Sequence, residues 1–405
     1  MSDKSSHIDF KSIGRIIVVI VMIAIFVGIV LFFTLGKSDD TSDSSVGMNI
    51  SSAGVKDMYP YPGGIVLLKD NSVEYYSSSG DLISSNSHAY SSPAITVNGR
   101  NVLIYDLGGK KIRIEKKCAS ADDIEVNSSI ICAAINKKGS YAYSLNADSG
   151  YQSHFFVYSS NNRLLFEGQN ADYVNCIALS DSHNYCAAGI LSTDNAKIVS
   201  TVKLYSFSDD SALYSVTFDN TVVYKLTFGD KDSLLCYTNN GLYKIDKTGA
   251  QSTVLSYTSA EINLYDTHFS GVGTVSTAVY GNENYIKVYA VSKKGELLYS
   301  KDFADNLTDL SVSRKYLSVL LDNTVYTYDV KGNIIGSAEF SSDCSKIVVS
   351  DGNIYVLGSE DIYCLSVRRN YGNVNIDDDK KSDSEATDAV VPSETDTTLE
   401  EITSN

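Results

Sequence analysis

One phrase recurs along this chain: a short run of alternating apolar and polar residues, then a turn residue, then a second alternating run. In TVYTYDVKGNIIGSAEF (324–340), Gly332 separates the two runs and follows Tyr328 by four residues. Alternation buries one face of a strand because successive side chains point to opposite faces, and the turn reverses the chain. The phrase therefore predicts a β-hairpin, and its repetition predicts a repeat architecture.

The same spacing between an aromatic or apolar residue and a turn residue occurs elsewhere in the chain. Glycine adopts a positive φ without steric cost, and Asn and Asp tolerate it better than most residues. Turns with Asn or Asp in place of Gly therefore fit the same pattern. The further pairs are Tyr76 with Gly80, Tyr158 with Asn162, Tyr205 with Asp209, Ile245 with Gly249, and Val291 with Gly295.

Residues 48–369 divide into eight units, each of which is expected to hold four short runs. At about 40 residues per unit, the period matches that of four-stranded β-propeller blades. No helical pattern of useful length interrupts the runs, which excludes a parallel α/β fold. We therefore predict an all-β propeller whose units begin near Val55, Pro93, Ser129, Asn175, Val222, Ile262, Leu307 and Cys344.

Two units depart from the pattern. The unit at 93–126 has its glycine pair, Gly108 and Gly109, between the second and third runs, so seven blades remain an alternative to eight. The last unit, from 344 to 369, holds only three runs. We expect segment 47–54 to supply its fourth strand, which closes the ring by hydrogen bonds and leaves no broken seam.

A charge-free segment of twenty residues, Ile16–Leu35, precedes the repeats. A helix of this length spans about 30 Å, the thickness of the hydrocarbon core of a bilayer. The segment is longer than the apolar region of a signal peptide, and no A-x-A cleavage site follows it. We predict an uncleaved, single transmembrane helix.

The charges beside this segment predict its orientation. Three basic residues precede it within residues 1–15, and Lys37 alone follows it. An excess of Lys and Arg keeps the preceding side of a helix in the cytoplasm. Residues 1–15 are thus expected to be cytoplasmic, and residues 36–47 are expected to form a flexible polar tether to an extracytoplasmic propeller at the cell membrane.

Residues 370–405 carry ten acidic residues and two lysines, and they account for half of the formal net charge of −16. With few apolar residues, this segment cannot bury enough surface to fold alone, so we expect a disordered acidic tail. No basic stripe occurs anywhere in the chain, which argues against nucleic acid as a partner.

The seven cysteines stand singly, and none forms a CxxC pair. Cys132, Cys236 and Cys364 lie in apolar runs, where cysteine behaves as a small hydrophobic residue. We expect buried thiols. Because seven is an odd number, the cysteines cannot all pair, and one or two disulfides remain open.

The units resemble those of WD40-like and quinoprotein-like (PQQ-like) β-propellers. The order of a short N-terminus, one helix, a polar tether, a propeller and an acidic tail is similar to that of membrane-anchored bacterial propellers of unassigned function. No Trp-Asp dipeptide ends a strand, and the chain has no tryptophan, which quinoprotein repeats carry in their docking motif. The resemblance therefore implies the shape of these proteins without their quinone cofactor.

No catalytic, cofactor-binding or metal-binding residue is predicted. GxSxG and Walker A sequences are absent. The glycine pairs at 63–64 and 108–109 are expected in propeller turns, and the acidic segment 376–381 lacks the spacing and closing Glu of an EF-hand loop. The histidines have no HxH or HExxH spacing that would indicate a metal site: they are His7, His88, His154, His183 and His268.

These observations predict a membrane-anchored binding or scaffolding module and not an enzyme. The 29 tyrosines suit a recognition surface, because Tyr offers contact area with a polar tip. The expected partner is a protein, a peptide or a cell-envelope glycan, although the binding residues are unknown. Two alternatives are a quinoprotein-like enzyme or redox protein, and a sensor that acts through a cytoplasmic partner because residues 1–15 are too short for a catalytic output domain.

Overall fold

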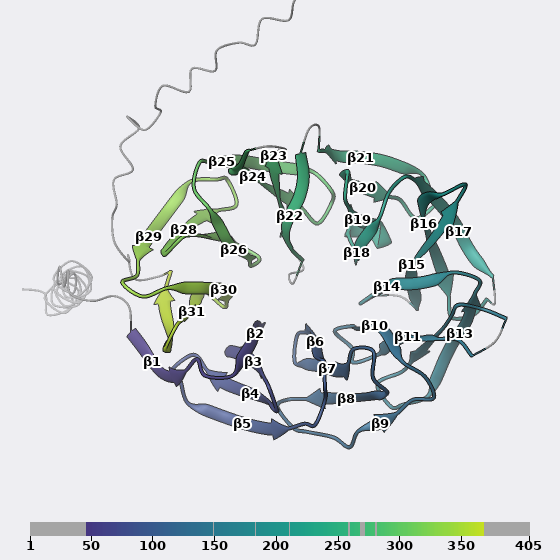
Figure 1. Ribbon diagram of the computed structural model, residues 1–405, viewed down its shortest axis with the longest axis horizontal. Coiled ribbons are helices and arrows are strands. Elements are labelled where there is room, and N and C mark those ends of the chain that lie inside the picture. The colour runs from purple at the N-terminus through teal and green to yellow at the C-terminus, as the bar shows by residue number, and fades with distance from the viewer. Residues whose placement is uncertain are drawn as a thin grey trace, which may run out of the picture. The chain divides into compact units, whose positions relative to one another are not determined.

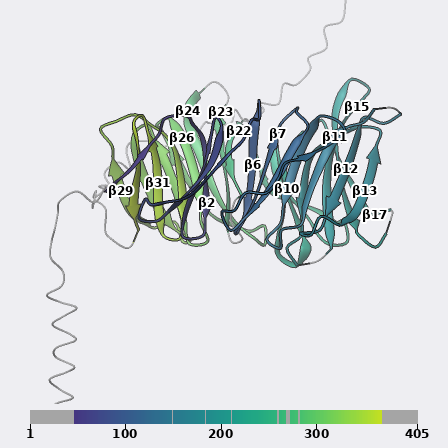
Figure 2. The ribbon, with the colours of Figure 1, turned by 90° about the horizontal axis from the view of Figure 1, so that it is seen from below.

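The computed structural model describes residues 46–367, except residues 149, 183, 210, 258–259, 268–271 and 280–281. Within these ranges the chain forms eight antiparallel sheets of four strands each, and one 3-10 turn, η1 (Asp230–Asp232). Figure 1 shows the sheets arranged as the blades of a ring, and Figure 2 shows the ring edge-on, with strands running between its two faces.

The first four blades follow one another along the chain. Blade 1 contains β2 (Val55–Tyr61), β3 (Gly64–Lys69), β4 (Ser72–Ser77) and β5 (Leu82–Ser87). Blade 2 contains β6 (Pro93–Asn98), β7 (Asn101–Asp106), β8 (Lys111–Lys116) and β9 (Ile124–Glu125). Blade 3 contains β10 (Ile130–Ile135), β11 (Tyr141–Asn146), β12 (Ser153–Tyr158) and β13 (Leu164–Asn170). Blade 4 contains β14 (Tyr173–Leu179), β15 (Tyr185–Asp194), β16 (Lys197–Ser206) and β17 (Ala212–Asp219).

The last four blades complete the ring. Blade 5 contains β18 (Val223–Phe228), β19 (Leu234–Thr238), β20 (Gly241–Ile245) and β21 (Gln251–Ser256). Blade 6 contains β22 (Ala260–Asp266), β23 (Val272–Val279), β24 (Asn282–Ser292) and β25 (Leu297–Phe303). Blade 7 contains β26 (Leu307–Val312), β27 (Tyr316–Leu321), β28 (Thr324–Asp329) and β29 (Ile334–Glu339). Blade 8 contains β30 (Cys344–Ser350), β31 (Asn353–Gly358), β32 (Asp361–Ser366) and β1 (Val46–Ser51).

The division into eight units is confirmed, and the alternative of seven blades is excluded. Four blades begin at the predicted residue, and the other four begin within two residues of it, at Ile130, Tyr173, Val223 and Ala260. The poorly matching unit is blade 2. Its glycine pair lies in the turn between β7 and β8, and its outermost strand, β9, has only two residues.

The ring closes through β1, as the sequence predicts. This strand pairs antiparallel with β32, and Ser51 lies opposite Asp361. The side chains of Met48 and Ile50 are buried against blade 1, where they contact the cluster that contains Met58 and Leu67. Strands from the two ends of the propeller therefore share one sheet.

The hairpin of blade 7 shows how the repeated turn is built. Gly332 has a φ of 84°, and its N–H donates to the carbonyl of Asp329 at 3.0 Å. The Asp329 carboxylate accepts the N–H groups of Lys331 and Asn333 at 2.8 and 2.9 Å. Equivalent backbone bonds close the turns that end at Gly80, Asn162, Asp209, Gly249 and Gly295.

The hydrophobic core lies between the blades. Among the described residues, eight clusters of buried apolar side chains occur, one at each blade interface. Tyr328 is buried between blades 6 and 7, and Tyr326 packs against the same cluster. Both tyrosines therefore serve interblade packing.

All seven cysteines are free thiols. Four are buried and three are partly buried, as the sequence predicts, and none of the disulfides left open is present. Burial raises the pKa of Cys176 to about 12, so this thiol remains protonated at neutral pH.

The N-terminal prediction lies outside this structure. Within the described ranges, no helix is long and apolar enough to cross a membrane. The predicted anchor at 16–35 and the acidic tail at 370–405 both lie outside the described residues.

Candidate binding site in the central channel

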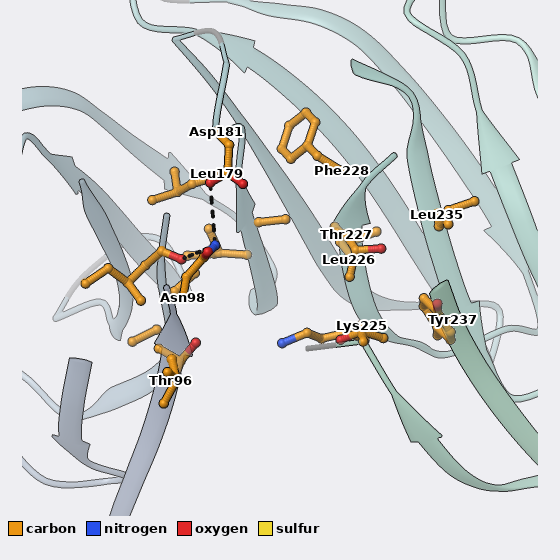
Figure 3. Close-up of a pocket in the computed structure, with 18 of the residues that line it drawn as sticks. Thr96, Asn98, Leu179, Asp181, Lys225, Leu226, Thr227, Phe228, Leu235 and Tyr237 are labelled. Carbon is orange, nitrogen blue, oxygen red and sulfur yellow. Dashed lines mark hydrogen bonds between the residues drawn. The ribbon is translucent and has the colours of Figure 1, made fainter. Parts of the chain in front are cut away.

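The first strand of each blade lies nearest the axis of the ring (Figure 1). A cavity of about 300 Å³ lies between these strands on the side of blades 2 to 6. Its walls come from β6, β10, β14 and β18, with further residues from blade 6 (Figure 3). Each wall belongs to a different blade, so the closed ring sets the shape of the cavity.

The lining combines apolar residues with polar groups, and more of its exposed surface is polar than apolar. Aliphatic and aromatic residues such as Ile95, Ile177 and Phe228 lie in the walls, together with backbone and polar side chains. The charged residues in the lining are Asp181, Lys225 and Lys293. A cavity of this size falls at the small end of the range for small-molecule sites.

A shared irregularity of the innermost strands determines which side chains they present. In seven of these eight blades, the pairing between the innermost strand and the second strand shifts by one residue near the start of the innermost strand. Such a shift is typical of a β-bulge, which bends the strand and changes the direction of its side chains. The residue after the shift occupies an equivalent position in each blade. Among the described residues we call these positions the channel ring: Asp57, Cys132, Cys176, Lys225, Leu264, Asp309 and Lys346.

Small residues lie two positions beyond the ring on three of the strands that line the cavity. On blades 3, 4 and 5 this residue is Ala134, Ala178 or Thr227, and all three line the cavity. On blade 1 it is Tyr59, whose hydroxyl donates to Asp57 at 2.6 Å. The small side chains of blades 3 to 5 therefore leave room for the cavity.

Lys225 is the channel-ring residue that lines the cavity, and Figure 3 shows its side chain reaching into the open space. No hydrogen bond or ion pair joins it to another residue in the described part of the chain. Burial lowers the pKa of its ammonium group, while Cys176, Cys132 and Asp266 oppose that shift. Lys225 is thus a lysine at the wall of the cavity that forms no direct ion pair, although the charge of Asp266 acts on it.

The opposite part of the channel ring is internally paired. The ammonium of Lys346 lies 2.6 Å from the carboxylate of Asp57. Asp309 accepts the N–H of Ile347 at 2.9 Å. Burial raises the pKa of Asp309 to about 6; the Ile347 N–H and the charge of Lys346 oppose this rise, and Asp266 adds to it. The charges of blades 7, 8 and 1 therefore compensate one another.

Asp181 lies at one end of the cavity and is held in place by two donors. Its Oδ1 accepts the N–H of Lys137 at 2.7 Å and the side-chain amide of Asn98 at 3.5 Å (Figure 3). The amide of Asn98 also donates to the carbonyl of Ile135 at 3.4 Å. These bonds hold the carboxylate at the wall, and no direct ion pair joins it to Lys225.

A second polar group, buried between blades 1 and 2, is structural. The guanidinium of Arg113 lies 2.7 Å from the carboxylate of Glu115, and both side chains are almost fully buried. Glu115 also accepts the hydroxyl of Tyr75 at 2.7 Å and the amide of Asn86 at 2.8 Å. The group joins two blades and does not line the channel cavity, so it stabilises the blade interface.

The two histidines within the described ranges do not come together. His88 follows β5, whereas His154 lies on β12, where the centroid of its ring lies 4.1 Å from that of Phe156. The other three histidines lie outside the described residues. No group of three His, Cys, Asp or Glu side chains suited to a metal ion occurs in the part of the chain that the structure describes.

Lys225 was not among the residues predicted from the sequence to have a function. One signal was present: in TVVYKLTF (221–228) a lysine interrupts the first, largely apolar run of a unit. Because the first run of each unit forms the innermost strand, a charge within it is a candidate channel residue. Asp309 and Lys346 occur in the same context.

The fold and this cavity define a class: an eight-bladed β-propeller with a ligand-sized cavity at its axis. The chain belongs to a family of unknown function (DUF5711), whose model matches residues 39–364. No curated protein sequence matches it.

Solved structures share the architecture. A eukaryotic initiation factor is 13% identical with a TM-score of 0.52, and the match covers 77% of this chain and 85% of that one. BamB from Moraxella catarrhalis is 15% identical with a TM-score of 0.49, covering 80% and 99%. Sqt1 from Saccharomyces cerevisiae is 12% identical with a TM-score of 0.49, covering 78% and 97%. At such identities the likeness to the initiation factor shows the fold alone.

Proposed function

We propose that this protein is a binding or scaffolding module of the cell envelope. In this proposal the segment 16–35 anchors it to the membrane as a single helix, and the propeller lies on the extracytoplasmic side. The charge-free segment and the basic residues before it support the anchor and its orientation. The partner is a protein or a peptide that the rigid ring recognises.

The observation that carries this proposal is the preformed cavity at the axis. Its walls are strands of several blades, held by the eight interblade clusters and by the closure through β1. A site built on rigid strands loses little conformational freedom when a ligand binds, so more of the contact energy appears as affinity. The structure thus favours recognition of a partner at the channel.

We place binding ahead of catalysis because of the charged groups that face the cavity. They are a carboxylate already engaged by Lys137 and Asn98, and two lysines. General acid–base catalysis uses a pair of groups that exchange protons with a substrate. A lysine that forms no direct ion pair is well suited to holding an anionic group.

A capture experiment tests the proposed function. The soluble fragment 46–405 begins at the closing strand and omits the predicted anchor. We expect the immobilised fragment to retain a partner from a solubilised envelope fraction, and free fragment to compete it off saturably. Failure to retain any competable protein or peptide would count against a binding role, and quinone absorbance in the purified protein would favour the redox alternative.

Membrane topology has its own test. In intact cells, an external protease should remove an epitope tag placed after residue 405, whereas a tag before residue 1 should survive until the cells are lysed. The reverse pattern would contradict the proposed orientation.

A further inference from the structure

We propose that the channel cavity is a carboxylate-binding site in which Lys225 is the counter-ion of the bound group. The proposal rests on the binding role above and specifies the chemistry of the ligand. The carboxylate is either that of a small free acid or one borne by a peptide, and the experiment below separates these sources.

The first argument is the missing partner of Lys225. In the channel ring its neighbours are the thiol of Cys176 and the side chain of Leu264, and the charge of Asp266 on blade 6 acts on it without forming a direct ion pair. The other lysine of the ring, Lys346, has a carboxylate at 2.6 Å. A buried charge without a partner is costly, so it is expected where a ligand supplies that partner.

The second argument is the supply of neutral donors around the same space. Thr96 and Thr227 both line the cavity, and neither hydroxyl forms a hydrogen bond with another described residue. Figure 3 shows Thr227 on the same strand as Lys225 and Thr96 on the opposite wall of the open space. A carboxylate has two oxygens and accepts several hydrogen bonds, so one ammonium with nearby hydroxyl groups is a suitable set of donors.

The third argument is the charge balance of the cavity. Its lining holds Lys225, Lys293 and the engaged carboxylate of Asp181, whereas the whole chain has a net charge of −16. The positive charge is therefore a local property of this site. Because the surrounding chain repels anions at long range, affinity for a carboxylate must depend on these few cations.

The fourth argument is size. A cavity of about 300 Å³ accommodates a small organic acid, or a single acidic side chain or chain terminus of a peptide. The small residues Ala134 and Ala178 leave this room beside Lys225. The site is thus matched to one carboxylate-bearing group and not to a folded partner inserted as a whole.

Isothermal titration tests the proposal with fragment 46–405 at constant ionic strength. The probes are acetate, succinate, and a tripeptide with either a free or an amidated C-terminus. We expect saturable binding of at least one carboxylate probe. Lys225→Met should weaken it roughly 30-fold or more, as expected for loss of one member of a buried charge pair. Lys225→Arg should stay within a few-fold of the wild type.

Lys197→Met is the matched control. Lys197 is exposed in the hairpin between β15 and β16, so this variant changes the net charge equally without touching the cavity. It should bind as the wild type does. Urea unfolding of each variant shows that the fold is retained, because Lys225→Met removes an unpaired charge and is not expected to unfold the ring.

The outcomes separate this proposal from the general binding role. Binding of acetate or succinate identifies a free acid, and binding of the free tripeptide but not the amidated one identifies a peptide terminus. Absence of any carboxylate binding overturns the proposal, as does equal binding by Lys225→Met. If Lys225→Met still captures the envelope partner as the wild type does, the proposed function stands and the assignment of Lys225 fails.

Discussion

Replacing Asp309 by Asn should stabilise the propeller at neutral pH and remove part of its pH dependence. Burial raises the pKa of Asp309 from 3.8 to about 6, against the Ile347 N–H and the charge of Lys346. The folded state therefore binds this proton more tightly than the unfolded state. Protonated Asp309 makes its full contribution to stability below about pH 4, and this contribution is lost as the pH rises to about 6.

The magnitude follows from the shift. A change from 3.8 to about 6 corresponds to up to about 3 kcal/mol, because one pKa unit is about 1.4 kcal/mol. Contact of the partly exposed carboxylate with water reduces this value. Asn resembles the protonated acid and retains an oxygen to accept the Ile347 N–H, so Asp309→Asn should match the wild type near pH 4 and exceed it near pH 7.5.

Urea unfolding followed by circular dichroism measures the difference, at pH 4.0, 5.0, 6.0 and 7.5. The matched control is Asp329→Asn in the same blade. Burial favours a higher pKa for Asp329, but hydrogen bonds from Asn333 and from the N–H of Lys331 outweigh it and lower the pKa. The charged carboxylate therefore stabilises the fold, and Asp329→Asn should lose stability at neutral pH. A difference between Asp309→Asn and the wild type that is zero or negative at every pH would refute the reasoning.

Three further substitutions test the frame of the ring, two by urea unfolding and one by limited proteolysis. Arg113→Ala leaves the Glu115 carboxylate buried without its cation and should lower the free energy of unfolding by about 3–5 kcal/mol. Replacing both residues by Leu should recover much of this loss. An equal loss in the single and the double variant would contradict this prediction. Ile50→Asp puts a charge into the closing sheet and should increase proteolysis at both ends of the propeller, while Asn49→Asp, at an exposed site, should not. Gly332→Val should lower the free energy of unfolding by about 1–3 kcal/mol, because Gly332 has a positive φ, and Gly332→Asn should lower it less. Identical effects of the two substitutions would argue against backbone strain.

The number of blades, their boundaries and the closing strand could be predicted because their causes are local. Alternation with a period of two and a turn residue such as Gly332 act within one hairpin, and a repeat of such hairpins implies a ring. The three runs after Cys344 then required a strand from elsewhere, and β1 supplies it. Each step uses residues close together in the sequence.

The buried polar groups could not be predicted in this way, because their partners come from other blades. Arg113 and Glu115 are two residues apart on β8, so a shared face was foreseeable. Their contact with Tyr75 of blade 1 was not, since it depends on how two sheets pack. The single register shift at the start of most innermost strands also has no sequence signal, although it decides which side chain enters the channel ring.

The position of Lys225 follows from the symmetry of the ring. In an eight-bladed ring, blade 5 lies opposite blade 1, so Lys225 and the pair of Asp57 and Lys346 occupy opposite sides of the channel. Tyr59 fills the side of that pair, whereas alanines leave space near Lys225. The position of Lys225 across the channel and next to the open space fits a residue that binds a ligand. The cost of burying the lysine in the empty protein is then offset when an anionic ligand binds.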